Sequence, residues 1–151
     1  MEKIDDLDRK ILGIITKNAR MPFKDVAAEC NVSRAAIHQR VQRLIDLGVI
    51  TGSAYLVNPK TLGYQISTYI GIKLEKGSLY KEVVPELEKI PEVVECHFTL
   101  GPYTLLIKLY AKNDEHLMQL LNNRIQEING VVSTETLMSL EERIKREIPV
   151  E

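Results

Sequence analysis

The sequence predicts an α+β protein in two parts, a helix-turn-helix (winged-helix-like) domain followed by a ferredoxin-like βαββαβ domain. Two observations carry this prediction. Over the first 50 residues, apolar side chains recur at spacings of three and four, which is typical of amphipathic helices. After residue 63, runs rich in β-branched and aromatic residues alternate with helical segments in the order strand, helix, strand, strand, helix, strand, which is the split βαβ arrangement.

Four segments are expected along the chain. They are a helix-turn-helix domain over residues 1–50, an extended hinge over 51–63, a ferredoxin-like domain over 64–140 and a charged tail over 141–151. The length of 151 residues, with 44% hydrophobic and 27% charged residues, is that of an ordinary globular protein. Because each half can bury only a small core by itself, we expect the chain to form oligomers.

A first helix is predicted to start at Ile4 and to end before residues 18–22. Asp5 and Asp6 lie near its start, where the helix dipole favours negative charge. The residues of its apolar face are Ile4, Leu7, Ile11, Ile14 and Ile15.

A second helix is predicted over residues 23–30 and a third over residues 33–47. The residues between them interrupt the apolar period, and the Ser33 hydroxyl is suited to cap the first N–H groups of the third helix. Gly48 ends that helix. The apolar faces consist of Phe23, Val26, Ala27 and Cys30 in the second helix and of Ile37, Val41, Leu44 and Leu47 in the third.

The outer face of the third helix combines side chains that can bind DNA. No acidic residue occurs from Ser33 to Ile45. A short helix with an apolar stripe on one side and Arg, Gln and His on the other fits a major groove. The expected DNA-binding residues are Ser33, Arg34, Ala35, His38, Gln39, Arg40, Gln42 and Arg43.

Different roles are expected within this surface. Arg34 and Gln39 are of the types that make bidentate contacts to guanine and adenine. Arg40 and Arg43, with Lys24 as a further candidate, are assigned to phosphate contacts, which position a protein without reading sequence. A solvated helix face without function is the alternative interpretation.

The charge is distributed unevenly along the chain. Residues 1–63 carry ten Lys and Arg against seven Asp and Glu, whereas residues 64–151 carry ten against fourteen. The net charge of −1 argues against a simple polycation that coats nucleic acid. The asymmetry places a nucleic-acid partner at the first part and an acidic module behind it.

The second part is expected to begin after a turn over residues 58–63. Gly101 and Pro102 form the turn of a predicted hairpin. Pro85 lies in a predicted helix, which tolerates proline only in its first turn. Residues 50–57 are rich in strand-forming side chains and are expected to be extended. The predicted strands are 66–74, 93–100, 103–111 and 131–140, and the predicted helices are 80–90 and 114–128.

Other chemistry finds little support in the sequence. Cys30 and Cys96 are far apart among apolar neighbours, so we expect buried thiols rather than a disulfide, and the three histidines show no metal-ligand spacing. We therefore expect no cofactor or metal. No nucleophile–base pair or phosphate loop indicates an enzyme. No signal peptide or membrane-length apolar run is present, so a cytoplasmic protein is expected.

Six short segments of the first part form a pattern in a fixed order. They are Leu7-Asp8-x-x-Ile11-Leu12, Asn18-Ala19-Arg20, Val32-Ser33, Arg40-Val41-x-Arg43-Leu44, Gly48-Val49-Ile50-Thr51-Gly52 and Leu62-Gly63. Together with a ferredoxin-like module that carries a Gly-x-Tyr turn, this pattern resembles the Lrp/AsnC (feast/famine) family of bacterial and archaeal transcription regulators. The resemblance covers essentially the whole chain.

The resemblance implies a sensor function for the second part. In that family, amino acids or related metabolites bind between subunits, modules pair through their sheets into dimers, and dimers often assemble into octamers. Thr104 stands where the family commonly has Asp, so this chain lacks a carboxylate there that would pair with a ligand ammonium. A hairpin turn with a packed aromatic ring is the alternative. The residues implied for the effector cleft are Gly101, Pro102, Tyr103, Thr104, Thr134 and Thr136.

The resemblance thus implies a sequence-specific, DNA-binding transcriptional regulator that senses an amino acid or related small metabolite. Its expected partners are double-stranded DNA, the effector and further copies of itself, up to tetramers or octamers. An architectural, nucleoid-associated protein that wraps DNA without an effector stays open as the alternative, although the modest excess of three positive charges on the first 63 residues weighs against it.

Overall fold

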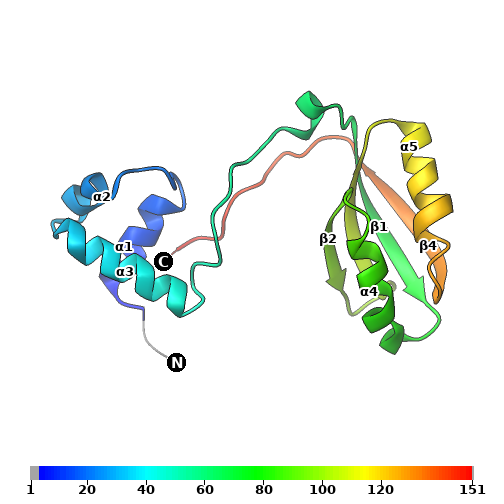
Figure 1. The fold of residues 1–151 in the computed structure, drawn as a ribbon, viewed down its shortest axis with the longest axis horizontal. Helices are drawn as coiled ribbons and strands as arrows, with labels where there is room; N and C mark the ends of the chain where they lie inside the picture. Colours follow the sequence, from blue (N-terminus) through cyan, green and yellow to red (C-terminus); the bar gives the residue numbers. More distant parts are fainter. Residues whose placement is uncertain (1–3, 151) are drawn as a thin grey trace. The chain divides into compact units, whose positions relative to one another are not determined.

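The computed structural model describes residues 4–150 and divides the chain into two compact units (Figure 1). The first unit extends to Leu56 and includes the residues from Ile144 onwards, and the second is Val57–Arg143. The first is built of helices and the second of a sheet with helices, which confirms the predicted α+β class. None of the helices within residues 4–150 has the length and apolar character needed to cross a membrane.

The first helix, α1 (Asp6–Ile15), begins with a reciprocal pair of hydrogen bonds. The Asp5 carboxylate accepts from the Asp8 backbone N–H at 2.8 Å, and the Asp8 carboxylate accepts from the Asp5 N–H at 3.1 Å. Such a capping box satisfies two N–H groups that the helix itself leaves unpaired. Ile4, which the apolar period includes in the helix, lies before this cap and therefore outside the helix.

A tight turn joins α2 (Phe23–Cys30) to α3 (Arg34–Asp46), as predicted. Asn31 adopts the left-handed conformation (φ 54°, ψ 42°) that ends α2, and the Ser33 hydroxyl accepts from the Ala36 N–H at 3.1 Å to cap α3. Leu47 is the exception to the predicted apolar stripe. It is 39% exposed because α3 ends at Asp46, before the stripe reaches it. The buried cluster of the three helices contains Ile11, Val26, Ala27, Cys30 and Ile37.

The segment after α3 is extended but pairs with no strand. Residues 51–58 have no regular secondary structure, and the Tyr55 and Leu56 side chains are 78% and 87% exposed. Extended backbone becomes a strand only when a neighbour satisfies its hydrogen bonds. A short 3₁₀ turn, η1 (Pro59–Leu62), follows and ends at Gly63, whose φ of 93° only glycine adopts without strain.

The second unit has the predicted βαββαβ order. Its four strands form one antiparallel sheet in the order β2-β3-β1-β4, which is the ferredoxin-like arrangement. β2 and β3 form the predicted hairpin. The elements are β1 (Ile66–Leu74), η2 (Gly77–Leu79), α4 (Tyr80–Glu88), β2 (Val93–Phe98), β3 (Leu105–Ala111), α5 (Asp114–Gln119), η3 (Leu120–Ile125) and β4 (Val131–Ser139).

Two details of the predicted helices are wrong. Pro85 is the sixth residue of α4, not part of its first turn. Both Pro85 and Lys81, whose carbonyl loses its helical partner, are exposed, so water can bind that carbonyl. The last helix is shorter as an α-helix than expected, because α5 continues as the π-helix η3.

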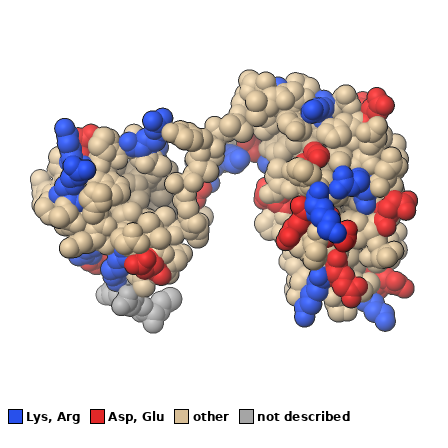
Figure 2. Space-filling view, in the orientation of Figure 1, with Lys and Arg blue, Asp and Glu red and all other residues tan. Residues whose placement is uncertain are grey.

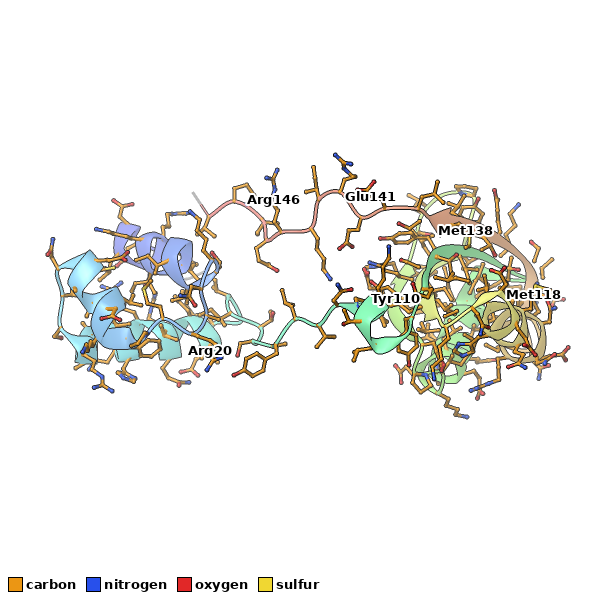
Figure 3. The ribbon with its side chains drawn as sticks, turned by 90° about the horizontal axis from the view of Figure 1, so that it is seen from above. Arg20, Tyr110, Met118, Met138, Glu141 and Arg146 are labelled. Carbon is orange, nitrogen blue, oxygen red and sulfur yellow. The ribbon has the colours of Figure 1, made fainter. Side chains whose placement is uncertain are left out.

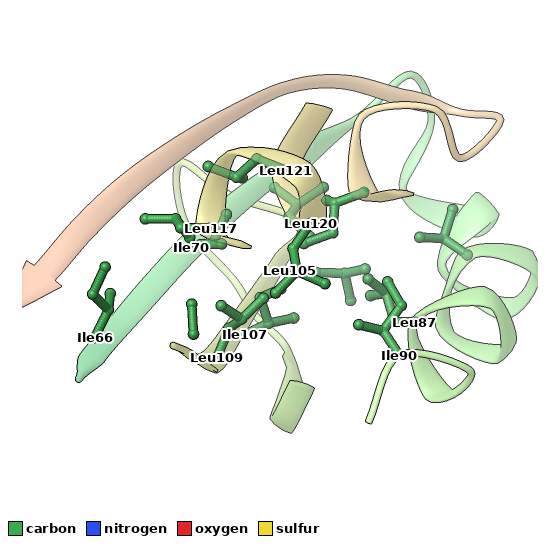
Figure 4. Packing of buried hydrophobic residues seen from close by; sticks show 14 of the residues in the cluster. Ile66, Ile70, Leu87, Ile90, Leu105, Ile107, Leu109, Leu117, Leu120 and Leu121 are labelled. Atoms are coloured by element: carbon green, nitrogen blue, oxygen red, sulfur yellow. The ribbon is translucent and has the colours of Figure 1, made fainter. Parts of the chain in front are cut away.

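The core of the second unit lies on one face of the sheet. Side chains of β1 and β3 that point to this face pack against α4, α5 and η3 (Figure 4). The fully buried residues include Ile70, Ile72, Val83, Leu105, Ile107, Leu109 and Ile125. Because successive strand residues alternate between faces, the residues between these point to the opposite face, which no helix of the second unit covers.

The tail after β4 has no helix or strand up to residue 150. Figure 3 shows the Glu141 and Arg146 side chains projecting from it. Glu142 forms an ion pair with Lys108 of β3, with 3.3 Å between its Oε2 and the lysine Nζ. The start of the tail is thus attached to the sheet face opposite the core.

Candidate DNA-binding surface and effector region

The outer face of α3 presents the side chains predicted to read bases. Arg34 and Gln39 are exposed, and within residues 4–150 neither has a side-chain hydrogen bond or ion pair. Their donors and acceptors are therefore free to meet base edges. The Ser33 cap and Ala35 lie at the exposed start of the same helix. Figure 2 shows fewer acidic groups on the visible face of the first unit than on that of the second.

His38 and Gln42 are partly engaged within the unit. The His38 ring meets Phe23 of α2 edge-on, with 4.5 Å between ring centroids, and this contact helps to hold α3 against α2. The Gln42 Nε2 donates to the Asp46 Oδ1 at 2.9 Å, one helical turn later. A shallow, open hollow runs along this part of α3. It is lined by His38, Gln39, Gln42, Arg43, Asp46 and Leu47.

The Arg40 and Arg43 side chains form ion pairs with acidic residues at the start of α1. The Arg40 Nη1 donates to the Asp5 carboxylate and lies 3.2 Å from the Asp8 Oδ1. The Arg43 Nη1 lies 3.1 Å from the other Asp8 oxygen. The hydrogen bond from Arg40, together with the one from the Asp8 N–H, lowers the pKa of Asp5 to about 2.

The two acids that receive these arginines were missed by reasoning along α3 alone. Ser33 to Ile45 is free of acidic residues, but the counter-charges come from α1, where Asp8 is fully buried. Asp5 and Asp8 are spaced as in a capping box, and this spacing at the predicted helix start is the sequence signal that could have identified both residues. That Asp8 is buried follows only from the packing of the helices.

The predicted effector turn is built around Tyr103. Its ring lies on Gly71 of β1 so closely that a Cβ at position 71 would come within 2.6 Å of it. The Tyr103 hydroxyl donates to the carboxylate of Glu135 on β4, and this hydrogen bond raises the pKa of Tyr103. Glu135 is the β4 residue paired with Gly71. Tyr103 thus crosses the sheet on the face opposite the core.

Thr104 forms two hydrogen bonds with the backbone of β1. Its N–H donates to the Ile72 carbonyl at 2.9 Å, and its hydroxyl oxygen accepts from the Leu74 N–H at 3.2 Å. The Thr99 hydroxyl donates to the Tyr103 carbonyl at 2.7 Å. These bonds fix the end of the loop, while Gly101 and Pro102 at its tip are exposed.

Thr134 and Thr136 lie on the other face of the sheet. They pair with Ile72 and Ile70, whose side chains are in the core, and the Thr134 hydroxyl accepts from the Gln126 Nε2 at 2.9 Å. Residue 135 between them points the opposite way, because strand side chains alternate. A single chain therefore does not bring the six predicted effector residues together.

The face opposite the core also holds a buried lysine. The Lys108 side chain is only 6% exposed and lies 5.6 Å and 5.4 Å from the ring centroids of Tyr69 and Tyr110. Burial lowers the pKa of Lys108, but the interactions with Tyr110 and Glu142 raise it by more. The net pKa therefore lies above the ordinary value for lysine, and Lys108 stays charged. This residue was not among the predicted site residues.

No cluster of three or more potential metal ligands occurs in the part of the chain that the structure describes. Cys30 is a buried free thiol and Cys96 is half-buried. Burial raises the pKa of Cys96, so its reactive thiolate form is disfavoured.

Two family models match the chain. Residues 4–51 match a winged helix-turn-helix DNA-binding domain, and residues 67–149 match the Lrp/AsnC ligand-binding domain. Among named relatives, the regulatory protein AsnC of Haemophilus influenzae is 38% identical over 148 residues, which is 98% of this chain and 99% of the relative.

Solved structures show the same fold. The structure of Escherichia coli AsnC superposes with a TM-score of 0.92 at 38% identity, covering 98% of this chain and 99% of that one. A feast or famine regulatory protein from Mycobacterium tuberculosis, complexed with L-methionine, superposes with a TM-score of 0.91 at 24% identity, covering 99% of this chain and 100% of that one. The named relatives are transcriptional regulators, not enzymes.

Proposed function

Because the chain belongs to the Lrp/AsnC family of transcriptional regulators, we propose that it is a cytoplasmic, sequence-specific DNA-binding regulator that senses an amino acid or related small metabolite. Residues 1–50 bind DNA, 51–63 form the hinge, and 64–140 bind the effector and assemble the oligomer. The observation that carries the DNA-binding role is the capped helix α3, on which Arg34 and Gln39 face outward and have no side-chain partner among residues 4–150.

The DNA contacts follow from this exposure. Arg34 and Gln39 read base edges, each worth roughly 1–3 kcal/mol of discrimination. Lys24, exposed on α2, contacts phosphate. A dimer places two α3 helices in successive major grooves, with half-sites one helical turn or a multiple of it apart.

A second copy of the chain supplies what the single chain lacks. The sheet face opposite the core carries Tyr69 and Leu137, which are 37% and 52% exposed, and pairing of two such faces would bury them. Binding between subunits also explains how residues on opposite faces can serve one effector site. Because face-to-face pairing leaves Thr134 and Thr136 on the side of each sheet away from the partner, the turn from Gly101 to Thr104 of one copy would meet them in a further contact between dimers.

The effector is a metabolite that does not depend on an acidic side chain at position 104. The methionine complex of the M. tuberculosis relative supports an amino acid or a related compound. Thr104 carries no charge, and its hydroxyl already accepts from the Leu74 N–H. An effector changes DNA affinity only if it binds one assembly geometry better than another.

Fluorescence anisotropy tests the DNA-reading role. The probes are a duplex selected by the protein from a random-sequence pool and a scrambled duplex of equal composition. Arg34→Ala should lose the preference for the selected duplex but keep the salt-sensitive binding to the scrambled one. Equal loss on both duplexes would contradict base reading by Arg34.

Native mass spectrometry with a panel of amino acids and metabolites tests the sensor role. We expect an oligomer that retains one of these compounds. An oligomer that retains none, combined with a footprint that covers long DNA of any sequence, would favour the architectural alternative instead.

A further inference from the structure

A fully buried carboxylate lies at the start of α1. Asp8 has no exposed surface, although an isolated carboxylate is strongly disfavoured away from water. Its oxygens receive three donors: the Asp5 N–H, Arg40 and Arg43. The buried charge is therefore compensated by groups from two different helices.

The cap of α1 does not itself require the arginines. Asp5 and Asp8 complete the capping box with each other's N–H groups alone. The remaining capacity of both carboxylates is used by Arg40 and Arg43, which come from α3, more than 30 residues later. The additional bonds thus join α1 to the proposed DNA-reading helix.

This joint has a fixed geometry. Arg40 and Arg43 are three residues apart and lie on one side of α3, and both converge on Asp8. A guanidinium binds carboxylates through a planar set of donors, so two such contacts restrict both the rotation and the axial position of a helix. The apolar core beneath also holds the helices together, but apolar contacts have no preferred direction, so the ion pairs add a directional restraint.

We propose that Asp5 and Asp8 are positioning residues of the DNA-reading helix. Through Arg40 and Arg43 they set the orientation of α3, and they keep these two cations away from the DNA backbone. Arg40 and Arg43 then contribute to specificity and not to the phosphate contacts assigned to them from sequence. This inference rests on the proposed DNA-binding function.

The two interpretations differ in salt dependence. The logarithm of the binding constant falls with the logarithm of salt concentration by about 0.9 for each phosphate contact. If Arg40 contacts phosphate, Arg40→Gln makes this slope shallower and leaves the ratio of affinities for selected and scrambled duplex unchanged. If Arg40 positions α3, the slope stays the same and the ratio falls.

The experiment compares full-length variants on the selected and scrambled duplexes described above, by anisotropy at several salt concentrations. Asp5→Asn removes the charge but keeps a good N-cap residue. Asp5→Asn and Arg40→Gln should each lower the affinity ratio on the order of tenfold, the effect of one charge-assisted hydrogen bond, without a shallower slope. Lys24→Gln is the matched control and should make the slope shallower by about 0.9 with an unchanged ratio.

Asp8→Asn provides a readout that a loss of stability cannot imitate. Weakening the contacts of Arg40 and Arg43 to α1 should strengthen binding to the scrambled duplex and steepen its salt slope, whereas partial unfolding weakens binding to every duplex. Circular dichroism melting confirms that each variant is folded at the assay temperature. If Asp8→Asn does not fold, Asp5→Asn and Arg40→Gln decide the question.

The outcomes separate the two proposals. A wild-type protein that enriches no sequence overturns the proposed function and this inference with it. A selective wild-type protein whose Asp5→Asn and Arg40→Gln variants keep the full affinity ratio overturns only the positioning role. A slope that becomes shallower in Arg40→Gln returns this arginine to the phosphate contacts.

Discussion

The two units hold their candidate functional residues in place by different means. In the first, α3 is joined to α1 by ion pairs to the buried Asp8. In the second, the Tyr103 turn is held by contact with Gly71 and by two hydrogen bonds between Thr104 and the β1 backbone. The comparison indicates that a three-helix unit with a small core relies on charge for orientation, whereas a sheet with a large core can rely on shape.

The largest effect is expected from Asp8→Ala. This substitution removes the partner that Arg40 and Arg43 share, and it should lower the free energy of unfolding of the first unit by about 3 kcal/mol. This value is at the lower end for a broken buried ion pair, because both arginines are one third exposed to water. Chemical denaturation followed by circular dichroism measures the loss. Asp6→Ala, at the exposed neighbouring position, is the control. A loss as small as that of the control would mean that charge does not hold this unit together.

Gly71→Ala tests the role of shape in the second unit. The new Cβ would lie 2.6 Å from the Tyr103 ring, so the ring must move and its bond to Glu135 must break. We expect a destabilisation of about 2 kcal/mol, typical of overpacking. Gly77→Ala, where a Cβ meets nothing within 4 Å, should change stability far less. Equal stability of the two variants would refute the steric account.

Thr104→Val should have a smaller effect on the same turn. Valine keeps the shape but cannot accept from the Leu74 N–H, and the lost bond should cost about 1 kcal/mol. Thr104→Ser, which keeps the hydroxyl, is the matched control. Thermal unfolding compares the three proteins. A valine variant with the melting temperature of the wild type would show that water accepts from the Leu74 N–H in place of the threonine hydroxyl.

Acid should weaken the first unit before the second. The pKa of Asp5 lies at about 2 in the folded chain, below its ordinary value of 3.8, so its contribution to stability is complete above about pH 4 and is lost as the pH falls towards 2. Amide NMR spectra recorded from pH 5 to 2 are the measurement, because their signals report on each unit separately. In Asp5→Asn this dependence should be reduced, and an unchanged pH profile would exclude Asp5 as its source.

Local structure could be predicted from sequence wherever neighbours along the chain decide it. β1 has the predicted bounds of Ile66–Leu74, the Ser33 cap of α3 is in place, and Gly101 and Pro102 lie in the hairpin loop. Alternation, capping and turn chemistry act over a few residues, so their signals survive in a single sequence.

The candidate sites depended more on tertiary structure. The base-reading candidates Arg34 and Gln39 could be named from helical periodicity, because exposure on a short amphipathic helix follows from its apolar stripe. The partners of Arg40 and Arg43 could not, since Asp5 and Asp8 are brought to them only by the packing of α1 on α3.

The sequence by itself determined the α+β class, the order of the elements and the helix face that carries the polar and basic side chains, because these follow from local periodicity and charge. Tertiary structure alone decided that Tyr103 lies over Gly71, that Thr134 and Thr136 lie on the other face of the sheet, and that Asp8 is buried. Strand register and helix packing join residues far apart in the chain, and a local pattern does not by itself say which of these residues become partners.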